Sequence, residues 1–374
     1  MIDIATTGAA PAAATTSATG WPRIAPAERW RRSQAVADGV LDVIGRTPTV
    51  ELSRIGQRSD VRLFGKLEFL NPAGSMKDRP SRKMIEEAIA DGRLRPGMTV
   101  VESSSGNMGI GLAQACAYHG YRFVCVVDPR TQRTNVQVMQ AYGATIDLVE
   151  QPDPETGDFL TARLNRVRQL VADSGDVFWP NQYANTHNPQ AHTEGTAAEL
   201  HAAAGPLDVL LVATSTTGTI GGCLSYFRRV SPQTRVIAVD AANSVLFGGA
   251  NGPRAISGLG AGREPELARG VRPDAIYRVS DLDCVVGCRR LVRAEALLTG
   301  GSTGGLIRVF ESLESTLPIG SRVGMIVPDH GSRYLETVYN DEWVTATTGA
   351  DMTAVESLVA ARSPDQLAPA GGAS

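Results

Sequence analysis

The sequence predicts an α/β protein with two three-layer α/β/α domains, each built on a largely parallel sheet. Short, β-branched apolar runs alternate with helix-length amphipathic stretches between the two ends of the chain. Most of these runs are continuously apolar, as expected of parallel strands that are covered on both faces. The 374 residues are also enough for two domains.

The predicted strands are short and spread over both halves of the chain. They are Val61–Leu67, Thr99–Glu102, Phe123–Asp128, Thr145–Val149, Val209–Thr214, Val236–Asp240, Tyr277–Val279 and Val323–Val327. Ligands of open α/β folds bind beyond the carboxyl ends of the strands, so residues directly after these runs are candidates for a site.

The predicted helices fall between these strands. They are Ser81–Asp91, Gly109–His119, Thr131–Tyr142, Phe159–Ala172, Ala191–Ala203, Gly218–Arg229, Asp283–Leu298 and Gly304–Thr316. Glycines follow the first three helices, where a left-handed C-cap favours them. The polar stretch Asn181–Asn188 lacks strong periodicity and is interpreted as the crossover between two sheets.

Composition excludes several classes of protein. The net charge of −3 and pI of about 6.0 do not favour a nucleic-acid or anionic-membrane partner. No apolar run approaches the ~18 residues of a membrane span, and the N-terminus does not resemble a secretory signal. An odd number of cysteines, five, favours a reducing cytoplasm over a disulfide framework. Cys284 and Cys288 lack a second Cys/His pair, so no metal site is predicted.

Lys77 is the first candidate for chemistry. The chain has only three lysines, Lys66, Lys77 and Lys83, and only a lysine amine can form a Schiff base with an aldehyde cofactor. Lys66 lies in an apolar strand and Lys83 on a charged helix face. Lys77 lies in a Pro/Gly turn, residues 71–79, that leads directly into a helix and can place its amine in a cleft. Taken alone, the alternative is an ordinary surface charge.

Three further loops each follow a strand or open a helix. The first is Glu102-Ser-Ser-Ser-Gly-Asn-Met-Gly109, whose hydroxyls and backbone amides are suited to bind a carboxylate. Alternatively, these serines only cap the following helix. Thr214-Ser-Thr-Thr-Gly-Thr-Ile-Gly-Gly222 offers a cradle for a phosphate without being a P-loop. In Gly300-Gly-Ser-Thr-Gly-Gly305, Ser302 could meet a pyridine nitrogen, and a serine there favours elimination because it does not hold that nitrogen protonated.

In order and spacing, these four segments resemble the fold-type II pyridoxal 5′-phosphate (PLP) enzymes of the cysteine synthase/cystathionine β-synthase family, over about residues 40–345. The resemblance implies PLP as cofactor, with Lys77 as Schiff-base lysine and proton shuttle. It also implies that Asn107 contacts the PLP 3′-oxygen and Ser302 the pyridine nitrogen. The implied phosphate contacts are Ser215, Thr216, Thr217, Gly218 and Thr219, and the implied contacts to the substrate carboxylate are Ser104, Ser105 and Gln182.

The same resemblance implies a domain organisation. Residues 40–80 and 180–345 would form a larger cofactor-binding domain, and residues 81–179 a smaller, movable substrate-binding domain. Residues 1–25 and 350–374 are expected to be disordered tails, because their composition cannot bury enough surface. Family members are homodimers, so a homodimer is expected here.

Departures from the usual cysteine synthase pattern indicate a branch of the family. Ser104 and Met108 replace two threonines, and Tyr183 replaces a common phenylalanine. These variants resemble the branch that joins O-phospho-L-serine to L-glutamate, giving N-(2-amino-2-carboxyethyl)-L-glutamate for 2,3-diaminopropionate in siderophores or peptide antibiotics. Arg163 is the candidate cation for the substrate phosphate, with the Tyr183 and Ser215 hydroxyls nearby. Alternatively, Arg163 lies on a solvated face of its helix and binds no substrate.

Two other functions stay open. The first is a cysteine synthase that uses O-phosphoserine or O-acetylserine with sulfide as the nucleophile. Sulfide is small and suits a tight site, whereas glutamate needs a wider mouth and a group that binds its carboxylate. The second is a catalytically silent homologue that acts by binding, which the presence of Lys77 and Asn107 disfavours.

Overall fold

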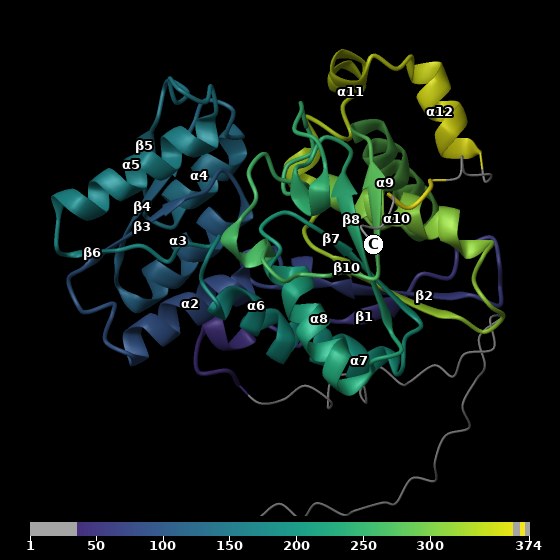
Figure 1. The fold of residues 1–374 in the computed structure, drawn as a ribbon, viewed down its shortest axis with the longest axis horizontal. Helices are drawn as coiled ribbons and strands as arrows, with labels where there is room; N and C mark the ends of the chain where they lie inside the picture. Colours follow the sequence, from purple (N-terminus) through teal and green to yellow (C-terminus); the bar gives the residue numbers. More distant parts are fainter. Residues whose placement is uncertain (1–35, 362–366, 371–374) are drawn as a thin grey trace, which may run out of the picture. The chain divides into compact units, whose positions relative to one another are not determined.

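The strands assemble into two separate sheets in the computed structural model, which describes residues 36–361 and 367–370 (Figure 1). The six-stranded sheet has the order β1-β2-β10-β7-β8-β9, in which only β1 is antiparallel to its neighbour. Its strands are β1 (Thr49–Glu51), β2 (Arg62–Leu67), β7 (Val209–Ala213), β8 (Arg235–Ala241), β9 (Ala275–Val279) and β10 (Arg322–Val327).

The four-stranded sheet is parallel throughout and has the order β5-β4-β3-β6. Its strands are β3 (Thr99–Ser103), β4 (Arg122–Val127), β5 (Thr145–Leu148) and β6 (Val177–Phe178). The predicted α/β class with largely parallel sheets is therefore confirmed. Two short strands, β1 and β6, were not predicted, because three and two residues give too little periodicity to detect.

Helices cover both faces of the six-stranded sheet. Along β7, Leu210 and Val212 face the core beneath α7 (Ala198–Ala204) and α8 (Gly218–Val230). The alternate residues Val209 and Leu211 face α9 (Asp281–Glu295) and α10 (Gly301–Glu314). Because successive strand residues point to opposite faces, this alternation gives a three-layer packing with an apolar core on each side.

The four-stranded sheet is covered in the same way. Val100 and Phe123 face α2 (Asp78–Ala90), α3 (Asn107–His119) and α4 (Arg133–Ala141). Val101 and Val126 face Val167 of α5 (Phe159–Asp173) on the other side.

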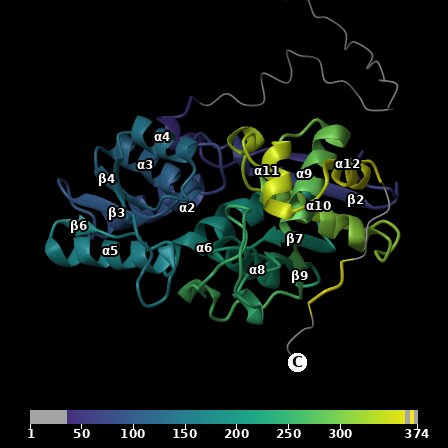
Figure 2. The same ribbon diagram turned by 90° about the horizontal axis from the view of Figure 1, so that it is seen from above.

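The chain passes from the four-stranded to the six-stranded sheet between β6 and β7, which confirms the predicted crossover. This segment contains α6 (His187–Ala191), a π-helical turn η3 (His192–Ala197) and α7. Helix α6 lies between the two sheets in both views (Figure 1 and Figure 2). Short 3₁₀ turns complete the described elements: η1 (Val40–Val43), η2 (Glu68–Leu70), η4 (Leu246–Gly248), η5 (Glu266–Ala268) and η6 (Gly331–Tyr334).

The C-terminal region differs from the prediction. The expectation of a disordered tail over residues 350–374 is wrong for Met352–Ala360, which forms α12 after α11 (Asp341–Thr348). Val355 and Val359, one helical turn apart, are buried in the core that includes α9, and Arg290 donates to the Leu358 carbonyl oxygen. The two valines form an apolar stripe that packs against the core, and the overall composition of the segment does not reveal such a stripe. The expected tail at residues 1–25 lies outside the described residues.

Within the described part of the chain, none of the helices has both the length and the apolar run needed to cross a bilayer.

Candidate active site

One cavity of about 150 Å³ collects the loops that the sequence analysis singled out. The loop after β3, the loop after β7 and the loop after β10 all open into it, together with the turn before α2 and the first turn of α10. Both sheets therefore contribute the carboxyl ends of their strands, where parallel α/β folds place ligands.

Nearly all of the predicted site residues line this cavity. They are Lys77, Ser104, Ser105, Asn107, Arg163, Gln182, Tyr183, Ser215, Thr216, Thr217, Thr219 and Ser302. Gly218 does not. A Cβ at Gly218 would lie 2.2 Å from Asn188 Oδ1, so this glycine serves the close packing of α8 against α6.

Lys77 stands at the N-cap of α2 and lines the cavity. Burial lowers the pKa of its amine to about 8, because the ammonium is poorly solvated there, while the Asp329 carboxylate acts in the opposite direction. The other two lysines are neutralised by glutamates. Lys66 pairs with Glu199 at 2.6 Å, and Lys83 pairs with Glu87 and Glu194. Among the three lysines, Lys77 is therefore the one that lines the cavity, and its amine becomes neutral at a pH well below the ordinary value for lysine.

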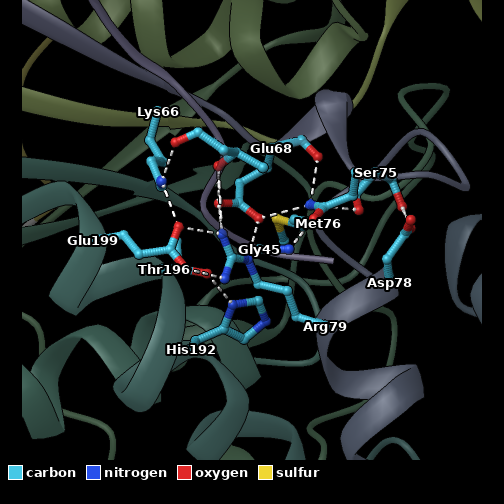
Figure 3. Close-up of polar contacts among 12 residues, drawn as sticks. Gly45, Lys66, Glu68, Ser75, Met76, Asp78, Arg79, His192, Thr196 and Glu199 are labelled. Carbon is cyan, nitrogen blue, oxygen red and sulfur yellow. Dashed lines mark hydrogen bonds and ion pairs between the residues drawn. The ribbon is translucent and has the colours of Figure 1, made fainter. Parts of the chain in front are cut away.

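A buried cluster of charges holds the turn that carries Lys77 (Figure 3). Arg79 donates to both carboxylate oxygens of Glu68, at 2.6 and 2.8 Å, and to both of Glu199, at 2.7 Å. Glu68 is completely buried and Arg79 is 6% exposed. Burial favours the neutral acid of Glu199, but the hydrogen bonds and charge of Arg79 overcome this and lower its pKa to about 2. These contacts tie the start of α2 to the end of β2 and to α7.

Asn71 fixes the other end of this turn. Its amide nitrogen donates to the Glu68 carbonyl oxygen at 2.7 Å and to the Ser75 carbonyl oxygen at 3.2 Å. Its amide oxygen accepts from the Gly45 N–H at 2.8 Å. Lys77 therefore projects from a turn that is clamped on both sides.

The loop between β7 and α8 has the chemistry of a phosphate site. Thr217 is β-branched and yet adopts a left-handed conformation, with φ of 64°, directly before the first turn of α8. Such strain tends to be kept at functional sites. The Thr216 hydroxyl is buried without a hydrogen-bond partner among the described residues. A free hydroxyl beside the N-terminus of a 13-residue helix suits an anion.

Asn107 and Ser302 lie at the junction of the two sheets. Asn107 Nδ2 donates to Asp329 Oδ2 at 2.8 Å, and Asn107 Oδ1 accepts from Arg333 at 2.5 Å. Each end of the amide keeps one further hydrogen-bonding position, which a ring oxygen could use. Ser302, 5% exposed, lies in the first turn of α10 and lines the cavity.

Asp329 is a site residue that was not predicted from the sequence. It follows β10, lines the cavity, accepts from Asn107 and from the Tyr334 hydroxyl, and has Oδ1 buried without a hydrogen-bond partner in the described residues. An acidic residue two positions after the apolar run Val323–Val327 was the signal that could have identified it.

The three residues predicted to contact the substrate carboxylate, Ser104, Ser105 and Gln182, differ in how far their side chains are already hydrogen-bonded within the protein. The Ser104 hydroxyl oxygen accepts from the Gly109 N–H at 2.9 Å and so caps α3. Ser105 is half-buried and Gln182 donates to the Ser103 carbonyl oxygen at 2.9 Å. Glu102, fully buried at the end of β3, accepts from the backbone N–H of Gln182, and burial raises its pKa to about 7. The crossover is thereby fixed against the loop that opens α3.

Arg163 faces the cavity rather than a solvated surface. It is 7% exposed, and its Nε lies 3.0 Å from Asp128 Oδ2. That contact lacks hydrogen-bond geometry, and Nε and Nη1 both have no hydrogen-bond partner in the described part of the chain. Tyr183 lies nearby with its pKa raised to about 12 by burial, so its hydroxyl keeps its proton. A buried, incompletely paired guanidinium is suited to an anionic group of a ligand.

Together these groups fit PLP. The lowered pKa of the Lys77 amine suits attack on an aldehyde, and the buried Thr216 hydroxyl suits a phosphate oxygen. Asn107 and Ser302 line the same cavity and are suited to the ring oxygen and ring nitrogen.

Comparisons with known proteins agree with this chemistry. Residues 40–329 match the family model described as pyridoxal-phosphate dependent enzyme. The chain is 43% identical to the N-(2-amino-2-carboxyethyl)-L-glutamate synthase of Ralstonia nicotianae over 83% of this chain and 91% of the relative. It is 41% identical to the synthase of the same name in Cupriavidus metallidurans, over 90% of this chain and 99% of the relative. The crystal structure of a cysteine synthase from Entamoeba histolytica superposes with a TM-score of 0.77 at 31% identity, over 88% of this chain and 97% of that one.

We expect the substitution Arg79→Gln to lower the free energy of unfolding by about 3–5 kcal/mol, because it leaves Glu68 buried without its cation. The matched control is Arg93→Gln, since Arg93 pairs with Asp91 on the surface, and such pairs contribute about 1 kcal/mol or less. Urea unfolding followed by circular dichroism measures both. Equal losses for the two variants would contradict the role of the cluster.

The rate at which cofactor-free protein takes up PLP is expected to rise with pH, with a midpoint of about 8. Below that pH the Lys77 amine is protonated and cannot attack the aldehyde; above it the amine is neutral. The appearance of visible absorbance after mixing measures the rate. In Asp329→Asn the midpoint should fall, because the carboxylate that favours the ammonium is gone. A midpoint near 10.5, the ordinary value for lysine, would refute a desolvated amine.

Proposed function

The chain belongs to the pyridoxal-phosphate dependent enzymes, and we propose that it joins O-phospho-L-serine to L-glutamate, forming N-(2-amino-2-carboxyethyl)-L-glutamate and phosphate. Two relatives with more than 40% identity over most of both chains carry the name of this synthase. The observation that carries the proposal is the buried, incompletely paired Arg163 in the same cavity as Lys77. A phosphorylated leaving group needs such a cation.

When bound, PLP withdraws electrons from the substrate Cα, which acidifies its C–H bond and favours loss of a group from Cβ. Lys77 Nζ is the base that takes the Cα proton, since its pKa of about 8 lies closer to neutral pH than the ordinary value for lysine. Ser104, Ser105 and Gln182 orient the substrate carboxylate. The neutral hydroxyl of Ser302 leaves the ring nitrogen without a carboxylate partner from this position, which favours elimination.

Two bonds change at Cβ. The Cβ–O bond breaks and its electron pair leaves with the phosphate, whose charge Arg163 and the protonated Tyr183 hydroxyl stabilise. The glutamate amine then forms the new N–Cβ bond and gives up one proton. Lys77 Nζ returns a proton to Cα, so its own protonation is restored over one cycle.

We further propose a cytoplasmic location, a homodimer and a role in the supply of 2,3-diaminopropionate. All five cysteines are buried and free, which is consistent with a reducing cytoplasm. A homodimer is expected, with residues 40–80 and 180–345 as the cofactor-binding domain and residues 81–179 as the movable one. The product would supply 2,3-diaminopropionate for siderophores or peptide antibiotics.

Incubation of the purified holoenzyme with O-phospho-L-serine and L-glutamate tests this function. We expect a product with the mass of N-(2-amino-2-carboxyethyl)-L-glutamate and one phosphate released for each product formed. Lys77→Ala should form none, whereas Lys83→Ala, which alters a lysine outside the cavity, should retain activity. Cysteine formation from sulfide without any glutamate adduct would instead establish a cysteine synthase.

Arg163→Gln should lower kcat/KM for O-phospho-L-serine by about 100-fold, as expected for loss of charge-assisted hydrogen bonds to a phosphate. Phosphate release from O-phospho-L-serine measures the effect, and turnover of O-acetyl-L-serine, which has no phosphate, should change far less. Arg166→Gln is the control on the same helix, because Arg166 pairs with Asp147 instead. Equal losses with both substrates would contradict a phosphate-binding role.

A further inference from the structure

A second cavity, of about 310 Å³, adjoins the cavity that contains Lys77. The two share part of their walls, namely Ser105, Arg163, Tyr183, Ser215, Ser257 and Gly258. We call the second cavity the outer chamber. The rest of its wall comes from the loop after β4, the start of α5 and the segment 254–265. A molecule in the outer chamber could therefore reach the reacting atoms across the shared wall.

The outer chamber has an excess of positive charge. Arg130, Arg163, Arg254 and Arg263 line it, against only Asp128 and Asp158. Both aspartates have partners in the protein. Asp128 lies beside Arg163 and accepts from the Arg130 N–H at 2.8 Å, and Asp158 caps α5 by accepting from the Thr161 N–H.

Three of these arginines have no carboxylate partner. Within residues 36–361 and 367–370, no ion pair is formed by Arg130, Arg254 or Arg263, whereas Arg163 in the same wall lies beside Asp128. Arg130 lies with its guanidinium carbon 4.8 Å from the centre of the Phe159 ring, which supports the planar group at the chamber wall. Unpaired guanidinium groups in a cavity are suited to carboxylates.

Arg254 is the most rigidly held of the three. Its Nη1 donates to the carbonyl oxygens of Asn243 and Gly252 and to Asn251 Oδ1, the last two at 3.1 and 3.2 Å. No hydrogen bond from Nε or Nη2 is found among the described residues. Partial burial lowers the pKa of Arg254, and the charges of Asp240, Asp158 and Asp281 act in the opposite direction without forming an ion pair with it among the described residues.

The glycine loop 258–262 shapes the chamber around Arg254. Gly260 has a φ of +75°, and a Cβ there would lie 3.0 Å from Arg254 Cδ. A Cβ at Gly262 would lie 2.9 Å from Arg254 Nη2. Both glycines thus let the loop backbone lie directly against the arginine. The loop and Arg254 form one packed unit in the chamber wall.

We propose that the outer chamber binds the carboxylates of the acceptor amino acid, with Arg254 as the principal contact and Arg130 as the second. This inference rests on the proposed function and names the residues that select its second substrate. A dicarboxylic amino acid offers two anionic groups to two arginines while its amine points across the shared wall. Arg163, in that wall, remains with the phosphorylated substrate, and a nucleophile as small as sulfide would use neither arginine.

The test separates the two substrates. In the Arg254→Gln holoenzyme, KM for L-glutamate should rise about 30-fold or more, as loss of a charge-assisted contact implies. Single-turnover release of phosphate from O-phospho-L-serine without glutamate should stay within about twofold of the wild-type rate, since Arg254 lies outside the inner cavity. Arg254→Lys should be intermediate, because it keeps the charge without the planar fork. The control is Arg229→Gln, an exposed arginine on α8.

Calorimetric titration of the same holoenzymes with L-glutamate, glutarate and L-glutamine gives a readout that does not depend on turnover. Wild-type protein should bind both dicarboxylates more tightly than glutamine, Arg254→Gln should lose that preference, and Arg229→Gln should keep it. An unchanged preference, or a loss of phosphate release with an unchanged KM for glutamate, overturns the inference. If the wild type forms no glutamate adduct, the proposed function fails, and the titrations alone still decide the role of Arg254.

Discussion

The buried contact of Arg79 with Glu68 and Glu199 is the interaction on which the site depends. Glu68 directly follows β2 of the six-stranded sheet, Arg79 lies in the first turn of α2 against the four-stranded sheet, and Glu199 lies in α7. One guanidinium therefore joins three elements, and its rigid fork satisfies both carboxylates. Lys77, two residues away, inherits that rigidity, which is what a reactive amine needs to meet a ligand in one geometry.

The charges near the site are divided by role. Lys66 and Arg79 are neutralised by glutamates within the protein, and their contribution is structural. Lys77 is desolvated and has no such partner among the described residues, while Arg163 is paired only incompletely. Arg254 and Arg130 lie farther out and lack carboxylate partners in the described chain. Cations without a full set of carboxylate partners among the described residues therefore extend from the inner cavity, where the first substrate is proposed to bind, to the outer chamber, where the second is proposed to bind.

The sequence predicted the α/β class, the crossover and more than half of the residues that line the inner cavity, because strand–loop–helix junctions rich in glycine and hydroxyls are local patterns. It missed what depends on long-range contacts. The partners Arg79 and Glu199 are 120 residues apart. Asp329 is identified as a site residue by its hydrogen bond with Asn107, which is 222 residues away. Arg254 belongs to no motif, and only the fold brings it beside the loop after β4. Helix α12 was missed because two buried valines give little signal in an alanine-rich segment.

Of the three lysines, we infer that Lys77 is the one whose amine binds the cofactor. Borohydride reduction of the holoenzyme, followed by proteolysis and mass spectrometry, tests it directly because reduction fixes the cofactor to the amine that holds it. We expect the added mass on Lys77 alone. Added mass on Lys66, which is paired with Glu199, or on Lys83, on the outer face of α2, would contradict it.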